Sequence, residues 1–184
     1  RYHVKSLFRY EAVSSQGKPY TLTSTKEELM FCYVMGDFVK IYRPNSKLRF
    51  LYGGEKQEDY VFGFEQLPNK GDILFITGGE KDVLSLSAHH FNAICFNSET
   101  ASIPENVIES LQLRFRHIIL LYDMDETGLR EAQRQAELLA KYNVLHLALP
   151  LEGTKNEKDI SDFFALGHTE NELRDLLTDK LSGM

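Results

Sequence analysis

Paired carboxylates stand directly after an apolar run. Asp123 and Asp125 lie two positions apart behind residues 118–122, which have the pattern of a buried strand. Side chains in a segment that turns out of a strand need not alternate between its two faces, so both carboxylates can reach one hard cation, which prefers oxygen ligands. The alternative is that one of these acids only caps a helix beginning near Thr127, a common role of Asp.

A second cluster follows the apolar run of residues 73–77 and reads GGEKD from Gly78 to Asp82. Because glycine has no side chain, Gly78 and Gly79 allow a phosphate or a metal to approach the backbone, and Lys81 supplies a positive charge for a phosphate. The alternative interpretation is a tight turn from a strand into a helix.

Both clusters fall where ligands bind in an open parallel sheet, beyond the carboxyl ends of its strands. A third acid, Asp159, follows the apolar run of residues 144–149. If that strand lies beside the strand that ends at Asp123, Asp159 joins Asp82 and the Asp123/Asp125 pair around one pocket. That set of acids is what a two-metal phosphoryl-transfer site uses, although Asp159 is also commonplace as a helix cap.

These residues depend on strands that deliver them to one edge of a sheet. From residue 73 onward, short apolar runs alternate with amphipathic stretches, which is typical of parallel strands joined by crossover helices. We expect an α/β fold with a mostly parallel, Rossmann-like sheet flanked by helices. The expected strands cover residues 73–77, 93–96, 118–122 and 144–149, and the expected helices cover residues 81–90, 105–115, 126–142, 159–166 and 169–177.

The preceding part of the chain is rich in aromatic residues separated by turn residues. We expect a small basic α+β or β-rich subdomain at residues 1–70, followed by the α/β domain with its helical tail at residues 71–184. A short helix is an alternative for residues 27–30, since Ser24 or Thr25 with the glutamates that follow resembles a capping box. The expected strands cover residues 6–13, 31–34, 38–42, 48–52 and 60–64.

Charge is distributed unevenly along the chain, whose net charge is −6. Residues 1–50 hold nine Lys/Arg and four Asp/Glu, a balance of +5, which leaves −11 for the remaining 134 residues. A basic surface of this kind can steer a polyanion toward an acidic centre that concentrates metal. Chance clustering on solvated faces is the alternative.

Composition narrows the class of protein. With 184 residues and 42% hydrophobic content, the chain can bury one core and a small satellite. It contains no apolar run of the roughly 20 residues that a membrane helix needs, and no signal-peptide pattern. Cys32 and Cys95 stand 63 positions apart in apolar runs, which favours buried free thiols over a disulfide. We therefore expect a cytoplasmic protein and, because numbering begins at Arg1, a piece of a longer one.

The glycine turn, the strand-end motif DMDETG that begins at Asp123, and the later pair Lys158 and Asp159 together resemble the Toprim domain. This is the metal-binding fold shared by bacterial-type primases, phage primase-helicases, topoisomerases and some nucleases. The resemblance covers about residues 71–168 and is greatest to the primase and primase-helicase branch.

That resemblance implies a DNA primase: a metal-dependent nucleotidyltransferase that makes RNA primers on a single-stranded DNA template from nucleoside triphosphates during replication. A replicative helicase, fused or separate, is an implied partner. The implied cofactor is Mg²⁺ or Mn²⁺, held by Asp82, Asp123, Asp125 and Asp159. The basic amino-terminal lobe would contact DNA phosphates through Lys40, Arg43, Lys47 and Arg49.

One position departs from the family pattern. The family carries a glutamate where Gly78 stands, whereas Gly79 and Asp82 match the glycine and the aspartate that follow it. Glu80 is then the catalytic candidate, because it lies two residues on and could reach the same pocket. A shift of two positions nevertheless moves a side chain by several ångströms, and catalysis tolerates little misplacement.

Two other functions stay open. The first is a binding module for metal or nucleic acid, in which the change at Gly78 has removed catalysis. The second is a phosphatase of the haloacid-dehalogenase type, whose motif the same segment resembles, with Asp123 as phosphoryl nucleophile and Asp125 as general acid. That family opens its core with this strand, whereas here an α/β half precedes the strand and only 57 residues follow Thr127.

Overall fold

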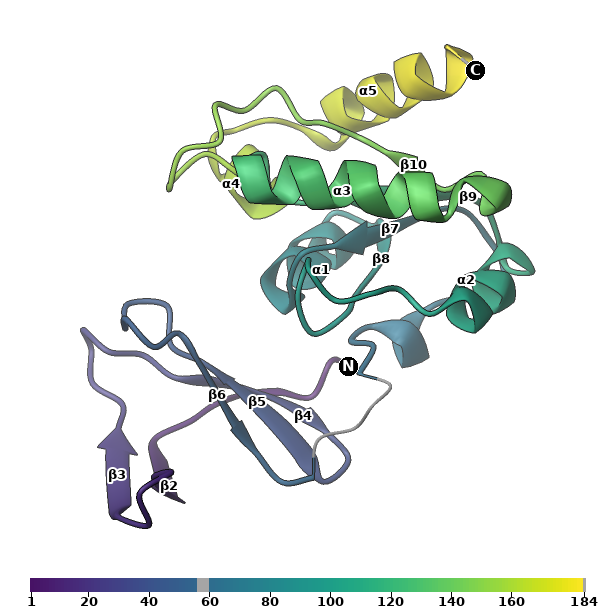
Figure 1. Cartoon of the computed structure of the whole chain (residues 1–184). Helices are drawn as coiled ribbons and strands as arrows, with labels where there is room; N and C mark the ends of the chain where they lie inside the picture. The colour runs from purple at the N-terminus through teal and green to yellow at the C-terminus, as the bar shows by residue number, and fades with distance from the viewer. Residues whose placement is uncertain (56–59, 184) are drawn as a thin grey trace. The chain divides into compact units, whose positions relative to one another are not determined.

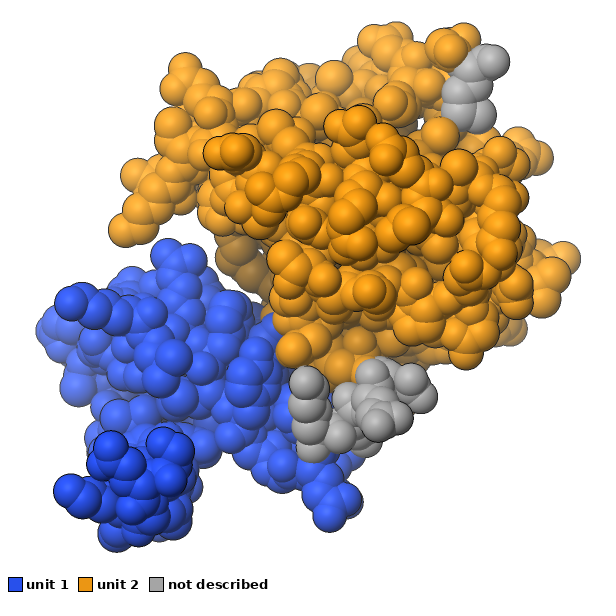
Figure 2. Space-filling model, viewed as in Figure 1, with its two compact units in different colours: residues 1–59 blue, residues 60–184 orange. Residues whose placement is uncertain are grey.

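The computed structural model describes residues 1–55 and 60–183. The chain forms two compact units, residues 1–59 and residues 60–184, each with its own hydrophobic core (Figure 2). The segment just after residue 60, which the sequence pattern grouped with the first part, belongs to the second unit.

In the first unit, four antiparallel strands form a sheet with the order β1-β4-β5-β6. They are β1 (Val4–Ser6), β4 (Phe31–Met35), β5 (Phe38–Tyr42) and β6 (Phe50–Gly53). Alternate side chains of these strands face inward, as expected of a sheet with one buried face. The buried core residues are Met30, Cys32, Ile41 and Leu51.

A separate hairpin in this unit pairs β2 (Arg9–Val13) with β3 (Pro19–Thr23). Residues 6–13, which were predicted as one strand, contain the last residue of β1 and the whole of β2. The strand β3 was not predicted. The short helix considered for residues 27–30 is absent. Thr25 Oγ1 accepts hydrogen bonds from the next backbone amides, as a helix cap does, but the chain then extends directly into β4.

In the second unit, four parallel strands form a sheet with the order β10-β9-β7-β8 (Figure 1). They are β7 (Gly71–Thr77), β8 (Asn92–Cys95), β9 (Phe115–Leu121) and β10 (Leu145–His146). This sheet confirms the predicted α/β class.

Three helices connect these strands, two more follow the last strand, and together they cover both faces of the sheet. They are α1 (Glu80–Ala88), α2 (Glu105–Gln112), α3 (Glu126–Leu138), α4 (Ile160–Ala165) and α5 (Glu170–Ser182). On one face, Leu74 shares a core with Ile108 of α2 and Ala132 of α3. Its neighbour Phe75 points to the opposite face. There its ring packs against that of Phe91, which follows α1, with ring centroids 5.7 Å apart. Among the described residues, no helix is both long enough and apolar enough to cross a membrane.

Two predicted strands of this part differ in the structure. The strand expected at residues 60–64 is reduced to a single bridge between Phe62 and Cys95, because Gly63 takes a left-handed backbone with a φ of 91° and a short 3-10 helix, Phe64–Gln66, follows. The strand expected at residues 144–149 is shortened to β10. Its end leaves the ladder where the Leu149 amide donates to Met124 Sδ at 3.0 Å.

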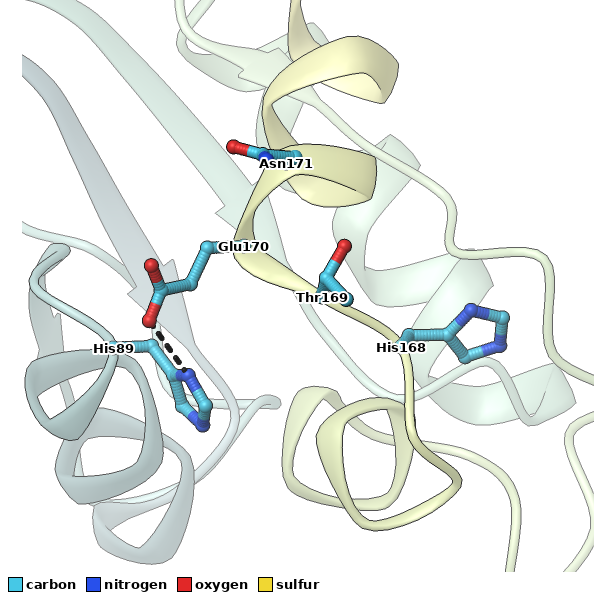
Figure 3. A pocket seen from close by; sticks show the side chains of 5 residues that line it. All are labelled: His89, His168, Thr169, Glu170 and Asn171. Carbon is cyan, nitrogen blue, oxygen red and sulfur yellow. Dashed lines mark hydrogen bonds and ion pairs between the residues drawn. The ribbon is translucent and has the colours of Figure 1, made fainter.

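The carboxyl-terminal helices are anchored on α1 at the pocket in Figure 3. His89, directly after α1, pairs its Nδ1 with Glu170 Oε1 at 3.1 Å, and its ring stacks on Phe164 with centroids 3.7 Å apart. The other lining residues are His168, Thr169 and Asn171. This pocket lies at the end of α1 opposite Asp82, seven residues or about 10 Å along the helix axis.

Candidate metal centre

The chain turns tightly where β9 meets α3, and this turn presents Asp123. Gly128, in the first turn of α3, packs so closely on the strand end that a Cβ there would collide with the carbonyl oxygen of Asp123 and lie 2.8 Å from its carbonyl carbon. The glycine of the DMDETG motif is therefore a steric requirement. It brings the amino terminus of α3 onto the strand that carries Asp123, whose exposure is only 9%.

Asp125 has a different role from Asp123. It is the N-cap of α3 and accepts a hydrogen bond from the Gly128 amide at 3.0 Å. This backbone hydrogen bond is the main reason that the pKa of Asp125 lies below its usual value. Of the two interpretations that the sequence left open for this pair, capping applies to Asp125, and its side chain stays 38% exposed.

Asp82 lies in the first turn of α1 and is 5% exposed. Its Oδ1 accepts a 2.7 Å hydrogen bond from the hydroxyl of Ser161 in α4. Burial, followed by the negative charge of Asp159, raises the pKa of Asp82 to about 8. The fold thus holds the carboxyl group of Asp82 in a place where its negative charge is poorly stabilised.

Asp159 is the N-cap of α4 and accepts a hydrogen bond from the Asp162 amide at 2.9 Å. Since β10 lies beside β9, the segment that follows β10 brings Asp159 to the carboxyl edge of the sheet, where Asp123 lies. The structure therefore gathers three of the predicted acids, with one carboxylate oxygen from each of Asp82, Asp123 and Asp159 within 4.8 Å of the others. Asp125 is not part of that group.

Two lysines pair with these carboxylates. Lys158 Nζ donates to Asp123 and lies 3.4 Å from Asp125 Oδ2, whereas Lys81 Nζ donates to Asp159 Oδ2 at 2.6 Å. Lys158 is fixed by its backbone as well, because its carbonyl accepts a 2.6 Å hydrogen bond from the Met124 amide. The acids are thus partly neutralised by ammonium groups that can also bind phosphate.

Glu80, the predicted catalytic residue, is 2% exposed, and its Oε1 accepts a 2.5 Å hydrogen bond from the hydroxyl of Tyr60. It is not among the carboxylates that gather at the centre. Glu99, which was not predicted from the sequence, instead lies against Asp123. Burial and then the Asp123 charge raise the pKa of Glu99 to about 8. Its position four residues after β8, at the carboxyl edge, is the signal that could have revealed it.

The predicted phosphate ligands surround the start of α1. Gly79 is its N-cap in an extended conformation that any residue can adopt, and a Cβ there would meet nothing closer than 3.8 Å. Gly78 differs, because the space beside it is filled by Glu99. Lys81, on the first turn of the helix, already bonds Asp159.

The basic residues predicted to contact DNA belong to the first unit. Lys40 is 2% exposed, and its Nζ lies 4.6 Å above the centroid of the Phe50 ring, which leaves little surface for a phosphate. Arg43 forms a 2.9 Å ion pair with Glu28. The remaining two, Lys47 and Arg49, are exposed.

Comparison with known families identifies the second unit. Residues 75–164 match the family Toprim_2, described as Toprim-like. This match includes all three gathered aspartates and replaces the haloacid-dehalogenase alternative. None of the curated protein sequences compared with the chain is significantly similar to it.

Solved structures share the fold. The primase fragment of the bacteriophage T7 primase-helicase protein has a TM-score of 0.64 and 22% identity, over 85% of this chain and 65% of that chain. The DnaG primase catalytic domain bound to ssDNA has a TM-score of 0.65 and 18% identity, over 92% and 57%. The E. coli primase catalytic core has a TM-score of 0.63 and 20% identity, over 92% and 56%.

The chain therefore spans less than two thirds of each of these three solved relatives. At these identities the likeness establishes the fold. The chain and these three primase structures share one arrangement of helices and strands. Together with the family match over residues 75–164, it shows that the second unit contains a Toprim-like domain with the fold found in these primase structures.

Proposed function

We propose that this chain is the Toprim catalytic core of a DNA primase or primase-helicase, which joins ribonucleotides into primers on a single-stranded DNA template. The observation that supports this proposal most is the group of three carboxylates, Asp82, Asp123 and Asp159, at the carboxyl edge of a Toprim sheet. Phosphoryl-transfer enzymes of this kind work mainly by positioning and by electrostatic stabilisation, and such a group serves both.

The donor set fits a divalent cation. All three side chains offer hard oxygen atoms, and these lie within 4.8 Å of one another. An octahedral Mg²⁺ with ligands at about 2.1 Å places its neighbouring oxygens about 3 Å apart and opposite ones about 4.2 Å apart. The spacing of these oxygen atoms therefore needs only small side-chain movements to match. Mg²⁺ and Mn²⁺ both suit oxygen ligands, and either is the proposed ion.

The residues of the site would divide the work. Asp82, Asp123 and Asp159 would hold the cation, which would supply charge neutralisation for the triphosphate oxygens and activation of the attacking hydroxyl. Lys81 and Lys158, which pair with these carboxylates, would bind the phosphate groups of the nucleotide.

Partners follow from the same proposal. The substrates are nucleoside triphosphates and a single-stranded DNA template, which Arg43, Lys47 and Arg49 of the first unit would contact through its phosphates. Lys40 was predicted to join them, but its burial makes it the weakest candidate of that set. A replicative helicase, fused or separate, is the proposed protein partner, and the buried free thiols of Cys32 and Cys95 agree with the reducing cytoplasm expected for such a protein.

A non-catalytic module is the second candidate, and Gly78 is the observation in its favour. The site then binds a cation or nucleic acid without chemistry. The two candidates make the same prediction for metal binding and differ only in product formation.

Template-dependent oligoribonucleotide synthesis by the full-length protein separates them. We expect products with Mg²⁺ or Mn²⁺, and their loss in Asp123→Asn and Asp82→Asn, while Asp72→Asn, an exposed acid far along β7, retains activity. Equal synthesis by the parent and the Asp123→Asn variant would contradict the catalytic assignment. Cation binding without any synthesis by the parent would select the non-catalytic module.

A further inference from the structure

The side chain of Glu99 fills the space next to Gly78. If Gly78 carried a Cβ, that atom would clash with Glu99 Oε1 and lie 2.7 Å from its Cγ and 2.9 Å from its Cδ. Real Cβ atoms do not approach other atoms so closely, so a side chain at residue 78 and the present position of the Glu99 carboxylate exclude each other. The two residues are 21 positions apart and come from the ends of different strands, β7 and β8.

We infer that Glu99 is the fourth carboxylate of the cation site, and that it supplies from the end of β8 the acid that the end of β7 lacks at Gly78. This inference rests on the proposed function, since it assigns a ligand to the proposed cation. It also explains why residue 78 is a glycine, which the approach of a phosphate does not require. The absence of a side chain there leaves room for Glu99.

The charge of Asp123 acts on Glu99. After burial, it is the main reason that the pKa of Glu99 is raised, so the two carboxyl groups lie near each other. Two carboxylates close together repel each other unless a proton or a cation lies between them, and a divalent cation would remove that repulsion. Glu99 thus extends the group of Asp82, Asp123 and Asp159 toward the end of β7.

The loop after β8 is built to hold this position. The Ala101 amide donates to the Ser98 carbonyl at 3.1 Å and closes a turn around Glu99. The next bond comes from α3, where Gln135 Nε2 donates to the Ala101 carbonyl at 3.0 Å. Gln135 is only 1% exposed, so the loop is tied to the buried side of the helix that Asp125 caps.

Glu80, the other glutamate near this edge of the sheet, is not available as a ligand of the cation. Glu80 is bound to the hydroxyl of Tyr60 and is 2% exposed. Releasing it would leave a buried tyrosine hydroxyl without this partner, which is costly in a protein interior. Glu99 needs no such rearrangement, because its carboxylate already lies beside Gly78 at the carboxyl edge of the sheet.

The test is Mn²⁺ binding by the full-length protein. Calorimetry measures the affinity, and electron paramagnetic resonance reports the surroundings of the bound ion. We expect Glu99→Gln to lower Mn²⁺ affinity about tenfold and to change the resonance spectrum, as loss of a carboxylate near a metal does. Glu152→Gln removes the same charge from an exposed position and should leave both unchanged. Glu99→Gln binding within twofold of the parent overturns the inference.

Gly78 offers an independent test in which Glu99 stays in the chain. In Gly78→Ala the new methyl group displaces the Glu99 carboxylate, so we expect a comparable loss of Mn²⁺ affinity. Gly79→Ala is the matched control, since a Cβ there has 3.8 Å of clearance. Parent-like affinity in Gly78→Ala would overturn the claim that the two residues share one place.

Asp123→Asn separates this inference from the proposed function. If Asp123→Asn loses Mn²⁺ and Glu99→Gln does not, the cation site stands and the assignment of Glu99 fails. If Asp123→Asn binds Mn²⁺ as the parent does, the cation site itself fails, and the assignment of Glu99 with it.

Discussion

Lys158 directs its ammonium group at the carboxylate of Asp123, the aspartate that follows β9. The same nitrogen lies 3.4 Å from Asp125. A cation held by Asp123 would compete with this lysine, which brings one positive charge where a divalent ion would bring two. The lysine would then be free to bind a phosphate.

Replacing this lysine should tighten cation binding. In Lys158→Met, the loss of a positive charge near the ion should raise Mn²⁺ affinity by about fivefold or more, because a pair of unit charges 4 Å apart is worth about 1 kcal/mol even in water. Nucleotide affinity should fall in the same variant. Calorimetric titration measures both, with Lys155→Met, an exposed lysine on the preceding turn, as the control. Weaker Mn²⁺ binding in Lys158→Met would show that the lysine supports the cation site instead of competing for it.

The buried carboxyl group of Asp82 should destabilise the fold when a chelator withholds divalent cations. Burial raises its pKa to about 8, so near neutral pH the folded chain carries the cost of a poorly solvated acid. We expect Asp82→Asn to raise the melting temperature in the presence of a chelator, by roughly 2 to 4 °C for each kcal/mol gained. The same variant should lose the stabilisation that Mg²⁺ gives the parent.

Thermal unfolding with a chelator and with Mg²⁺ tests both halves of this prediction. Asp175→Asn, on the exposed side of α5, is the control and should behave as the parent in both conditions. A lower melting temperature of Asp82→Asn in the chelator would mean that its hydrogen bond with Ser161 outweighs the cost of the buried charge.

The α/β class and the three gathered aspartates could be predicted because periodicity and chain order carry that information. Short apolar runs separated by amphipathic stretches specify parallel strands, and parallel strands align their carboxyl ends at one edge. Asp123 follows such a run directly, and Asp82 lies five positions after another, in the glycine-containing turn into the next helix. Asp159 could be placed only conditionally, because its position depended on β10 lying beside β9.

Glu99 and Glu80 could not be assigned from the sequence because their roles depend on contacts between distant segments. Glu80 is adjacent to the motif, yet a hydrogen bond to Tyr60, 20 positions away, holds it elsewhere. Glu99 lies in an irregular loop with no periodic pattern, and only the packing of β8 beside β7 brings it to Gly78. The β2–β3 hairpin was missed for a related reason, since Pro19 at the start of β3 is a turn signal in sequence.

Gly128 should be intolerant of a methyl group, against the usual preference of helices. Helix propensity alone predicts that Gly128→Ala stabilises α3 by about 1 kcal/mol. A Cβ at this position meets the Asp123 backbone at 2.8 Å, so we expect net destabilisation by about 1 to 3 kcal/mol and weaker Mn²⁺ binding. Chemical denaturation measures the first effect, with Gly183→Ala, where a Cβ has 3.6 Å of clearance, as the control. A stabilised Gly128→Ala protein would contradict the steric role of this glycine.

His146 in β10 should make stability dependent on pH. Burial, and then the charge of Lys180, hold its pKa below the usual value, and its Nδ1 is buried without a hydrogen-bond partner in the described part of the chain. The unfolded chain then binds the proton more readily, so the free energy of unfolding falls as pH drops below about 6.5. Urea denaturation between pH 5 and 8 should show a shallower pH dependence in His146→Gln than in the parent. His90→Asn, at an exposed position with a left-handed backbone that Asn tolerates, should keep the parent's pH dependence.

DNA binding by the first unit should depend on its exposed cations. If Lys47 and Arg49 bind phosphates, changing both to Gln weakens binding to single-stranded DNA of any sequence. The slope of log affinity against log salt concentration should also become shallower, by about 0.7 for each phosphate that the variant no longer neutralises. Fluorescence anisotropy of the full-length protein at several salt concentrations measures this slope, and Lys26→Gln, an exposed lysine of the same unit, is the control. If the double variant kept the parent's salt dependence, Lys47 and Arg49 would not contact the DNA. The template would then have to bind elsewhere on the protein.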